Sequence, residues 1–108
     1  MSLSTHVLDA MAGRPAEGVA VRLEERIDGD WHTTAEGSTD ADGRIGALGS
    51  PGAGTHRLHF DTGAYFGAAG VATFYPEVTV TFTVVDASAH HHVPLLLSPF
   101  AFSTYRGS

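Results

Sequence analysis

The chain contains no cysteine and no lysine. Without cysteine it has neither a disulfide framework nor a thiolate metal site. Its six basic residues are all arginines, spaced singly in a chain of net charge -6, which argues against nucleic acid and anionic membranes as partners. No apolar run approaches the length of a membrane span. The N-terminus has no basic stretch followed by an apolar core, so we expect no secretory signal and a cytoplasmic location.

The length of 108 residues predicts a single domain, spanning residues 1–108. A domain of this size buries a modest share of its surface, so its 43% of hydrophobic residues must form an efficient core. Seven histidines, three of them consecutive at 90–92, are the unusual feature of the composition.

Alternating apolar and polar residues dominate the chain and predict strands. Val19, Val21 and Leu23, for example, alternate with charged or small residues, and Asp28-Gly29-Asp30 predicts the hairpin turn that follows. The strands expected are 3–9, 19–27, 31–38, 44–48, 55–61, 77–85, 90–97 and 101–105. Such short strands separated by turns predict an all-β fold, a two-sheet antiparallel sandwich.

One segment, 62–70, differs from this pattern. Thr62 is a candidate N-cap, alanines and aromatics follow it, and Gly70 is a candidate C-terminal stop. The sequence therefore predicts one short helix here, which needs tertiary contacts because its glycines weaken it.

The run from Val93 to Leu97 is apolar on both faces of its strand. One face of an antiparallel sandwich normally meets water, so this strand needs a second cover. Two explanations remain open: an irregular, fully buried central strand, or a sheet face on which Pro94 and Leu96 contact another subunit.

Period-two alternation places His90 and His92 on this second face, and His91 on the opposite one. His6 in the first strand and Ser103 in the last also fall on a face away from the core. The pattern does not determine whether these faces coincide.

These segments resemble a known family. Residues 92–99, His-Val-Pro-Leu-Leu-Leu-Ser-Pro, and the C-terminal Tyr-Arg-Gly-Ser at 105–108 resemble the 5-hydroxyisourate hydrolases, transthyretin-like enzymes of urate breakdown. Further matching segments occur in order along the whole chain, at 5–10, 13–16, 40–44, 60–62 and 74–77. Position 91, usually aromatic in that family, is His91 here, and Phe100-Ala-Phe102 replaces a segment that often contains tyrosine.

The resemblance implies a transthyretin-like sandwich assembled as a homotetramer, a dimer of dimers, with active sites between the dimers. It also implies hydrolysis of the six-membered ring of 5-hydroxyisourate to 2-oxo-4-hydroxy-4-carboxy-5-ureidoimidazoline, with no cofactor and no metal. By its motifs the catalytic residues are His6, Arg44 and His92, and the substrate-binding residues are Tyr105, Arg106, Gly107 and Ser108.

The chemistry of these side chains fits hydrolysis of a cyclic amide. A neutral imidazole deprotonates water near neutral pH, so His6 or His92 is the expected general base, and the other orients the water or donates a proton. A guanidinium such as that of Arg44 stabilises developing oxyanion charge and binds planar oxygenated rings.

The same kinds of residues also allow other interpretations, chiefly metal binding. His90 and His92, with His6, form a minority candidate for a metal site. Asp40-Ala-Asp-Gly43 resembles the start of a calcium loop but lacks its glutamate, which favours a turn. His32, His56 and His59 match no active-site motif and are expected at the surface or in loops.

The main rival function is a transthyretin-like carrier of a small planar ligand. Such a carrier needs an apolar channel and lacks both the His–Arg–His set and the Tyr-Arg-Gly-Ser end, so the sequence favours the enzyme. A sugar-binding or adhesive sandwich would expose aromatic residues on loops, for which Trp31 is the only hint.

Overall fold

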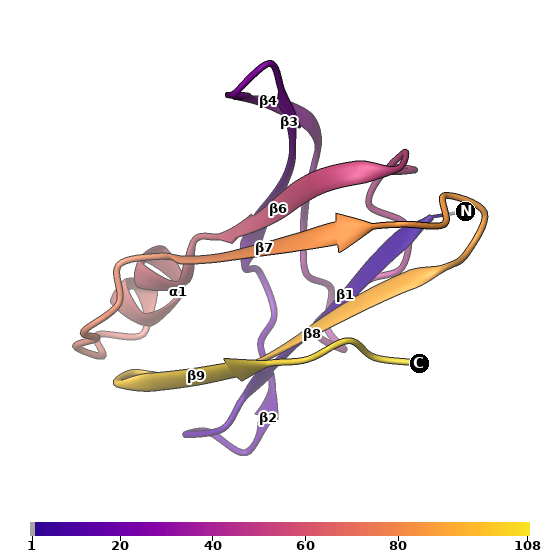
Figure 1. The fold of residues 1–108 in the computed structure, drawn as a ribbon. Coiled ribbons are helices and arrows are strands. Elements are labelled where there is room, and N and C mark those ends of the chain that lie inside the picture. Colours follow the sequence, from indigo (N-terminus) through magenta and orange to yellow (C-terminus); the bar gives the residue numbers. More distant parts are fainter. Residues whose placement is uncertain (1) are drawn as a thin grey trace.

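The structure is a computed structural model and describes residues 2–108. Figure 1 shows two layers of strands with one helix at one end of the molecule. The elements are β1 (Leu3–Asp9), β2 (Arg14–Pro15), β3 (Ala20–Ile27), β4 (Asp30–Ser38), β5 (Arg44–Ile45), β6 (Gly54–Phe60), α1 (Thr62–Ala68), β7 (Val78–Val84), β8 (His91–Ser98) and β9 (Ala101–Thr104).

The strands form two sheets, which confirms the predicted sandwich. The first sheet has the order β2-β1-β8-β9, with β5 also paired to β1, and the second has the order β4-β3-β6-β7. One pairing departs from the antiparallel pattern: β1 and β8 run parallel, from Leu3 opposite His91 to Asp9 opposite Leu97. Both termini therefore lie at the same end of the molecule (Figure 1).

The core lies between the sheets and follows the alternation of the strands. In β1, Leu3 and Val7 are fully buried, whereas Ser4, His6 and Leu8 are half-buried on the outer face. The largest apolar side chains of the core are Phe60, Phe66, Leu3, Leu23, Leu58, Leu95 and Leu97. Each fully buried side chain of this size contributes about 1.5–3 kcal/mol.

The structure of β8 decides only in part between the two explanations for a strand that is apolar on both faces. Val93, Leu95 and Leu97 face the core, as predicted. Pro94, on the opposite face, is already buried within the single chain, where the C-terminal segment passes beside it. Leu96 on the same face is half-buried. At Pro94, then, the C-terminal segment of the same chain covers the second face of the strand.

The helix α1 is confirmed, but its cap differs from the prediction. Asp61, not Thr62, is the N-cap, and its carboxylate accepts the N–H of Ala64. Thr62 is instead fully buried, and its hydroxyl donates to the carbonyl of Tyr75. The end of α1 is close to expectation, at Ala68 rather than Gly70.

A buried carboxylate joins this helix to β1. Asp9 is 4% exposed and accepts the hydroxyl proton of Tyr65 at 2.7 Å. Its other oxygen accepts the N–H groups of Met11 and Ala12, which close the turn after β1. Burial and the hydrogen bond to Asp9 raise the pKa of Tyr65 to about 12, so the phenol remains a donor.

Two further predictions need correction. The strand expected at 44–48 pairs only at Arg44–Ile45, beyond which Leu48 turns into the core. His56 is not a surface or loop residue, because it is 1% exposed within β6, where its Nε2 contacts the carbonyl of Gly52 at 2.7 Å. Within residues 2–108 no helix is long and apolar enough to cross a membrane.

Candidate active site

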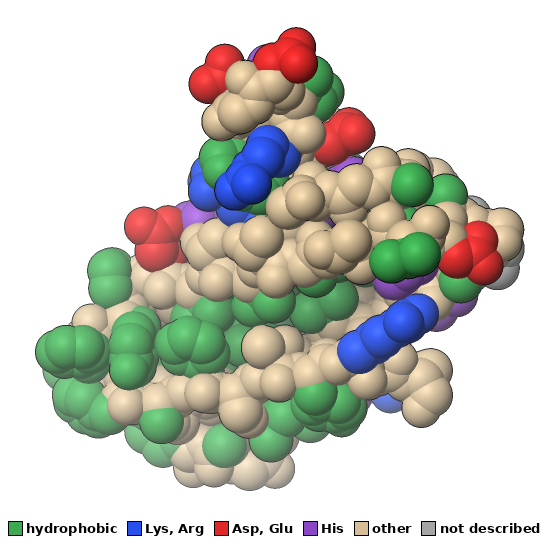
Figure 2. Space-filling view, viewed as in Figure 1, with side chains coloured by type: hydrophobic (Ala, Val, Ile, Leu, Met, Phe, Trp, Pro, Cys, Tyr) green, Lys and Arg blue, Asp and Glu red, His purple; other side chains and the backbone are tan. Residues whose placement is uncertain are grey.

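The register of three strands brings the predicted catalytic residues together. The parallel pairing of β1 with β8 sets Ser4 opposite His92 and His6 opposite Pro94. The antiparallel pairing of β1 with β5 sets His6 opposite Arg44. The outer faces of these strands therefore coincide, which the sequence pattern alone did not determine. Figure 2 shows histidine side chains at the same end of the molecule as the two termini.

A tight turn positions Arg44. One carboxylate oxygen of Asp40 accepts the N–H groups of Asp42 and Arg44, at 2.9 and 3.0 Å. Gly43 has a φ of +75°, and a Cβ at this position would lie 2.3 Å from the carbonyl oxygen of Val7. Only glycine lets the turn approach β1 this closely. The Asp40–Gly43 segment is thus the expected turn, and it aligns Arg44 with His6.

His92 and His90 share one hydroxyl group. The Oγ of Ser4 lies 2.7 Å from Nδ1 of His92 and 2.9 Å from Nε2 of His90. Because Nδ1 of His92 is engaged, its Nε2 is the nitrogen available for chemistry. His91 points the other way, as predicted, is 7% exposed, and its Nδ1 contacts the carbonyl of Ala89.

The electrostatic surroundings of His92 favour its neutral form. Burial lowers the pKa of His92 below its usual 6.5, and the nearby charge of Arg44 and the imidazoles of His6 and His90 lower it further. Desolvation and positive neighbours both disfavour the imidazolium. A neutral imidazole at pH 7 is the form that accepts a proton.

The C-terminal segment folds back onto His92. The N–H of Gly107 donates to the carbonyl of His92 at 2.8 Å, in an isolated antiparallel bridge. A Cβ at position 107 would lie 2.4 Å from Cδ2 of His92. Glycine is therefore required for the segment to lie against the imidazole, and it places Ser108 at the site.

These residues surround a hollow of about 280 Å³, lined by Ser4, Thr5, Arg44, Ile45, Gly46, His90, His92 and Ser108. His6 lies beside it, level with Arg44. Tyr105 and Arg106 border a different, mostly apolar hollow between the two sheet edges, with Val80, Phe82 and His91. Within one chain, then, Arg44 and Ser108 line one hollow, Tyr105 and Arg106 line the other, and His92 lines both.

Ser4 was not among the residues identified from the sequence. It lies two positions before His6, on the same face of the first strand, but a lone serine there carries no signal of its own. Only the register with β8 reveals that it meets two histidines.

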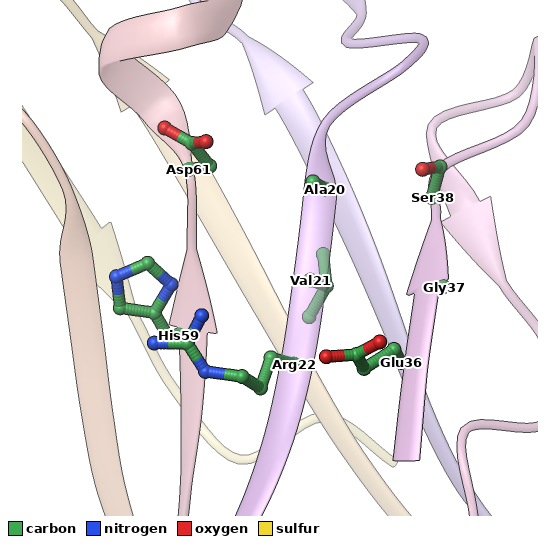
Figure 3. A pocket seen from close by; sticks show the side chains of 8 residues that line it. All are labelled: Ala20, Val21, Arg22, Glu36, Gly37, Ser38, His59 and Asp61. Carbon is green, nitrogen blue, oxygen red and sulfur yellow. The ribbon is translucent and has the colours of Figure 1, made fainter. Parts of the chain in front are cut away.

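A larger hollow of about 410 Å³ lies on the second sheet (Figure 3). Arg22 and His59 lie on neighbouring strands there, and Glu36 reaches toward Arg22 from β4. Its cationic groups already have partners, because His59 pairs with Glu77, and Arg22 lies 3.8 Å from Glu24. This surface is therefore mainly an ion-paired face of the second sheet.

The structure does not support the minority metal site. Within residues 2–108 no three His, Cys, Asp or Glu side chains are grouped to hold a metal ion. His90 and His92 meet at the hydroxyl of Ser4 instead. Trp31, the hint of a sugar-binding or adhesive surface, has its ring covered. The guanidinium groups of Arg26 and Arg57 lie over it at 5.0 and 4.2 Å.

Comparisons with known proteins agree on the family and cover almost the whole chain. The family described as HIUase/Transthyretin matches residues 3–107. A 5-hydroxyisourate hydrolase of Salmonella typhimurium is 48% identical over 109 residues, which span 98% of this chain and 80% of that protein. The structure of Klebsiella pneumoniae 5-hydroxyisourate hydrolase is 39% identical, with a TM-score of 0.87 and full coverage of both chains. Sea bream transthyretin, solved with thyroxine, is 35% identical, with a TM-score of 0.92 over 99% of this chain and 95% of that one.

Proposed function

The chain belongs to the HIUase/Transthyretin family, and we propose that it hydrolyses 5-hydroxyisourate rather than carrying a ligand. The fold does not separate these two functions, because the TM-score is 0.92 to a transthyretin and 0.87 to a hydrolase. The decisive observation is the polar cluster on the first sheet. There His6 lies opposite Arg44 in the pairing of β1 with β5, and the pKa of His92 is lowered.

An imidazole kept neutral beside a guanidinium is suited to catalysis. A carrier of an apolar or weakly polar ligand gains nothing from burying a titratable base, since each buried polar group costs free energy. Perturbed pKa values in a cavity are typical of catalytic sites.

In the proposed reaction, Nε2 of His92 accepts a proton from water while the water oxygen attacks a carbonyl carbon of the six-membered ring. Arg44 stabilises the negative charge that develops on the carbonyl oxygen. The ring C–N bond then breaks, and the ring nitrogen takes up a proton, with His6 in position to assist. The product, 2-oxo-4-hydroxy-4-carboxy-5-ureidoimidazoline, retains the new carboxylate. No cofactor takes part.

The C-terminal segment positions the substrate in this proposal. Ser108 lines the hollow next to Arg44 and His92, and it supplies a hydroxyl. The hydrogen bond from Gly107 to the His92 carbonyl fixes this end of the chain. Tyr105 and Arg106, which lie at the sheet edges in the single chain, complete the pocket in the assembly.

That assembly is the homotetramer, a dimer of dimers. Support comes from the edge strands β7 and β9, which each pair on one side only, and from the apolar side chains visible between them (Figure 2). Tyr105 is 59% exposed and Phe100 is 68% exposed beside these edges. A homotetramer covers these groups and the half-buried Leu96.

The proposed function is tested by generating 5-hydroxyisourate from urate with urate oxidase and following its decay optically. We expect the protein to accelerate the decay over the spontaneous rate. If it binds the compound without accelerating its decay, the carrier function is correct and the hydrolase is not.

The cytoplasmic location expected from the sequence stays a prediction. Fractionation of the native cells, followed by detection of the protein, tests it directly.

A further inference from the structure

The arrangement of Ser4 between two imidazoles restricts where their protons lie. A hydroxyl has one proton to donate and lone pairs to accept with. Its Oγ contacts Nδ1 of His92 at 2.7 Å and Nε2 of His90 at 2.9 Å. When both rings are neutral, Ser4 cannot donate to both nitrogens, so at least one of the two nitrogens must carry a proton.

Both contacts are paired in three states, and in two of them Ser4 uses its own proton within the group. In the first, Nδ1–H of His92 donates to Ser4, and Ser4 donates to Nε2 of His90. In the second, Nε2–H of His90 donates to Ser4, and Ser4 donates to Nδ1 of His92. In the third, both nitrogens donate to Ser4. The first and third states leave Nε2 of His92 without a proton, but only the first, in which Ser4 donates to His90, connects that base to a proton acceptor.

We propose that Ser4 and His90 are positioning residues that hold His92 in its reactive tautomer and relay the proton it accepts to His90. This inference rests on the proposed hydrolase function. It adds two residues to the site, neither of which touches the substrate in the mechanism above.

The relay balances as a transfer of one proton. His92 accepts a proton at Nε2 from the attacking water and becomes an imidazolium. Its Nδ1 proton then passes to Oγ of Ser4, while the hydroxyl proton of Ser4 passes to Nε2 of His90. His92 is neutral again with its proton on Nε2, Ser4 is unchanged in charge, and His90 carries the positive charge. The reverse transfer restores the His92 imidazolium, whose Nε2 proton can then go to the leaving ring nitrogen, which returns the group to its first state.

The surroundings favour movement of the charge toward His90. His92 is half-buried and faces the positive charge of Arg44 and the imidazole of His6, whereas His90 is exposed, so water solvates a charge on its ring. Moving the charge from the less to the more solvated ring lowers its desolvation cost.

The test compares Ser4→Ala with Ser4→Thr, which keeps a hydroxyl, and with Ser38→Ala, an exposed serine of the second sheet. Long-range ¹H–¹⁵N spectra of the imidazoles report the tautomer of His92 without any substrate. We expect Nδ1–H in the wild type and in Ser4→Thr, and a change toward Nε2–H, the form an unrestrained imidazole prefers, in Ser4→Ala.

The kinetics provide the second measurement. We expect Ser4→Ala to lower kcat by at least about tenfold, a part of the 10²–10⁴ that general acid–base catalysis supplies, with little change in KM. His90→Ala should lower kcat less, and Ser4→Thr and Ser38→Ala should stay near the wild-type rate. An unchanged tautomer in Ser4→Ala, or a Ser4→Thr variant as slow as Ser4→Ala, overturns the relay.

These outcomes are separable from a failure of the proposed function. If the wild type does not accelerate the decay of 5-hydroxyisourate, the hydrolase proposal fails whatever the spectra show. If the wild type is active and Ser4→Ala matches it in tautomer and in kcat, only the relay fails.

Discussion

At the scale of single residues, the site depends on a few close contacts around one imidazole. Ser4 contacts Nδ1 of His92, and the N–H of Gly107 donates to the His92 carbonyl. The charge of Arg44 lowers the pKa of the His92 imidazole. Each of these neighbours affects either the charge or the position of the ring. Their separate effects can be measured.

The charge of His92 should respond to Arg44. Because burial and Arg44 both disfavour the imidazolium, His92 should titrate below 6.5 in an NMR pH series and so remain a base as the pH falls toward that value. Arg44→Gln removes a positive charge and should move the midpoint upward. Arg26→Gln, on the other sheet, should leave it unchanged. A wild-type midpoint at or above 6.5 would contradict this account.

The position of His92 should respond to Gly107. In Gly107→Ala the new methyl would lie 2.4 Å from Cδ2 of His92, so the ring or the chain end must move. We expect kcat/KM to fall by about tenfold or more, because small misplacements at a catalytic group are costly. Gly67→Ala, in α1 with open space around it, is the matched control and should keep full activity. Equal activity of the two variants would show that the chain end does not position the ring.

At the scale of elements, the sequence predicted the strands and the helix well, because alternation and turn residues are local signals. His6 and His92 were assigned from the family motif, and their outward-facing positions agree with period two. The meeting of Ser4 with His92 was not predictable, since it depends on the parallel register of β1 and β8. His56 was misplaced for another reason: period two puts it on the core face with Leu58 and Phe60, but burial of a polar ring needs a partner, and the carbonyl of Gly52 lies outside the strand pattern.

The helix α1 is attached to the first sheet by the hydrogen bond from Tyr65 to Asp9. Tyr65→Phe removes the donor to a buried carboxylate, so the free energy of unfolding should fall by about 1.5–3 kcal/mol. Tyr75→Phe, whose hydroxyl has no hydrogen bond to another residue of 2–108, is the control and should change it little. Urea denaturation measures both. A Tyr65→Phe variant as stable as Tyr75→Phe would show that this bond contributes nothing net.

At the scale of the whole molecule, the apolar content has two uses. Most of it forms the core between the sheets, and the C-terminal segment covers Pro94. Leu96 remains half-buried on the outer face, and edge strands stay unpaired on one side. The proposed tetramer accounts for this remainder.

Light scattering after size-exclusion chromatography tests the assembly. We expect a mass of four 11.3 kDa chains for the wild type. Leu96→Glu places a charge on the outer face of β8 and should reduce the mass, with the circular dichroism unchanged. Ile27→Glu, at the exposed end of β3, should remain a tetramer. A monomeric wild type, or a tetrameric Leu96→Glu, would contradict the predicted interface.

The most direct test of the central claim compares the decay of 5-hydroxyisourate in the presence of the wild type, His6→Ala, Arg44→Ala, His92→Ala and His32→Ala. His32 is exposed on β4, away from the site, and serves as the matched histidine control. We predict that each of the three site variants loses about 10²–10⁴ in rate, as expected for groups that transfer protons or stabilise charge, while His32→Ala equals the wild type. Wild-type rates in all three site variants would contradict the account.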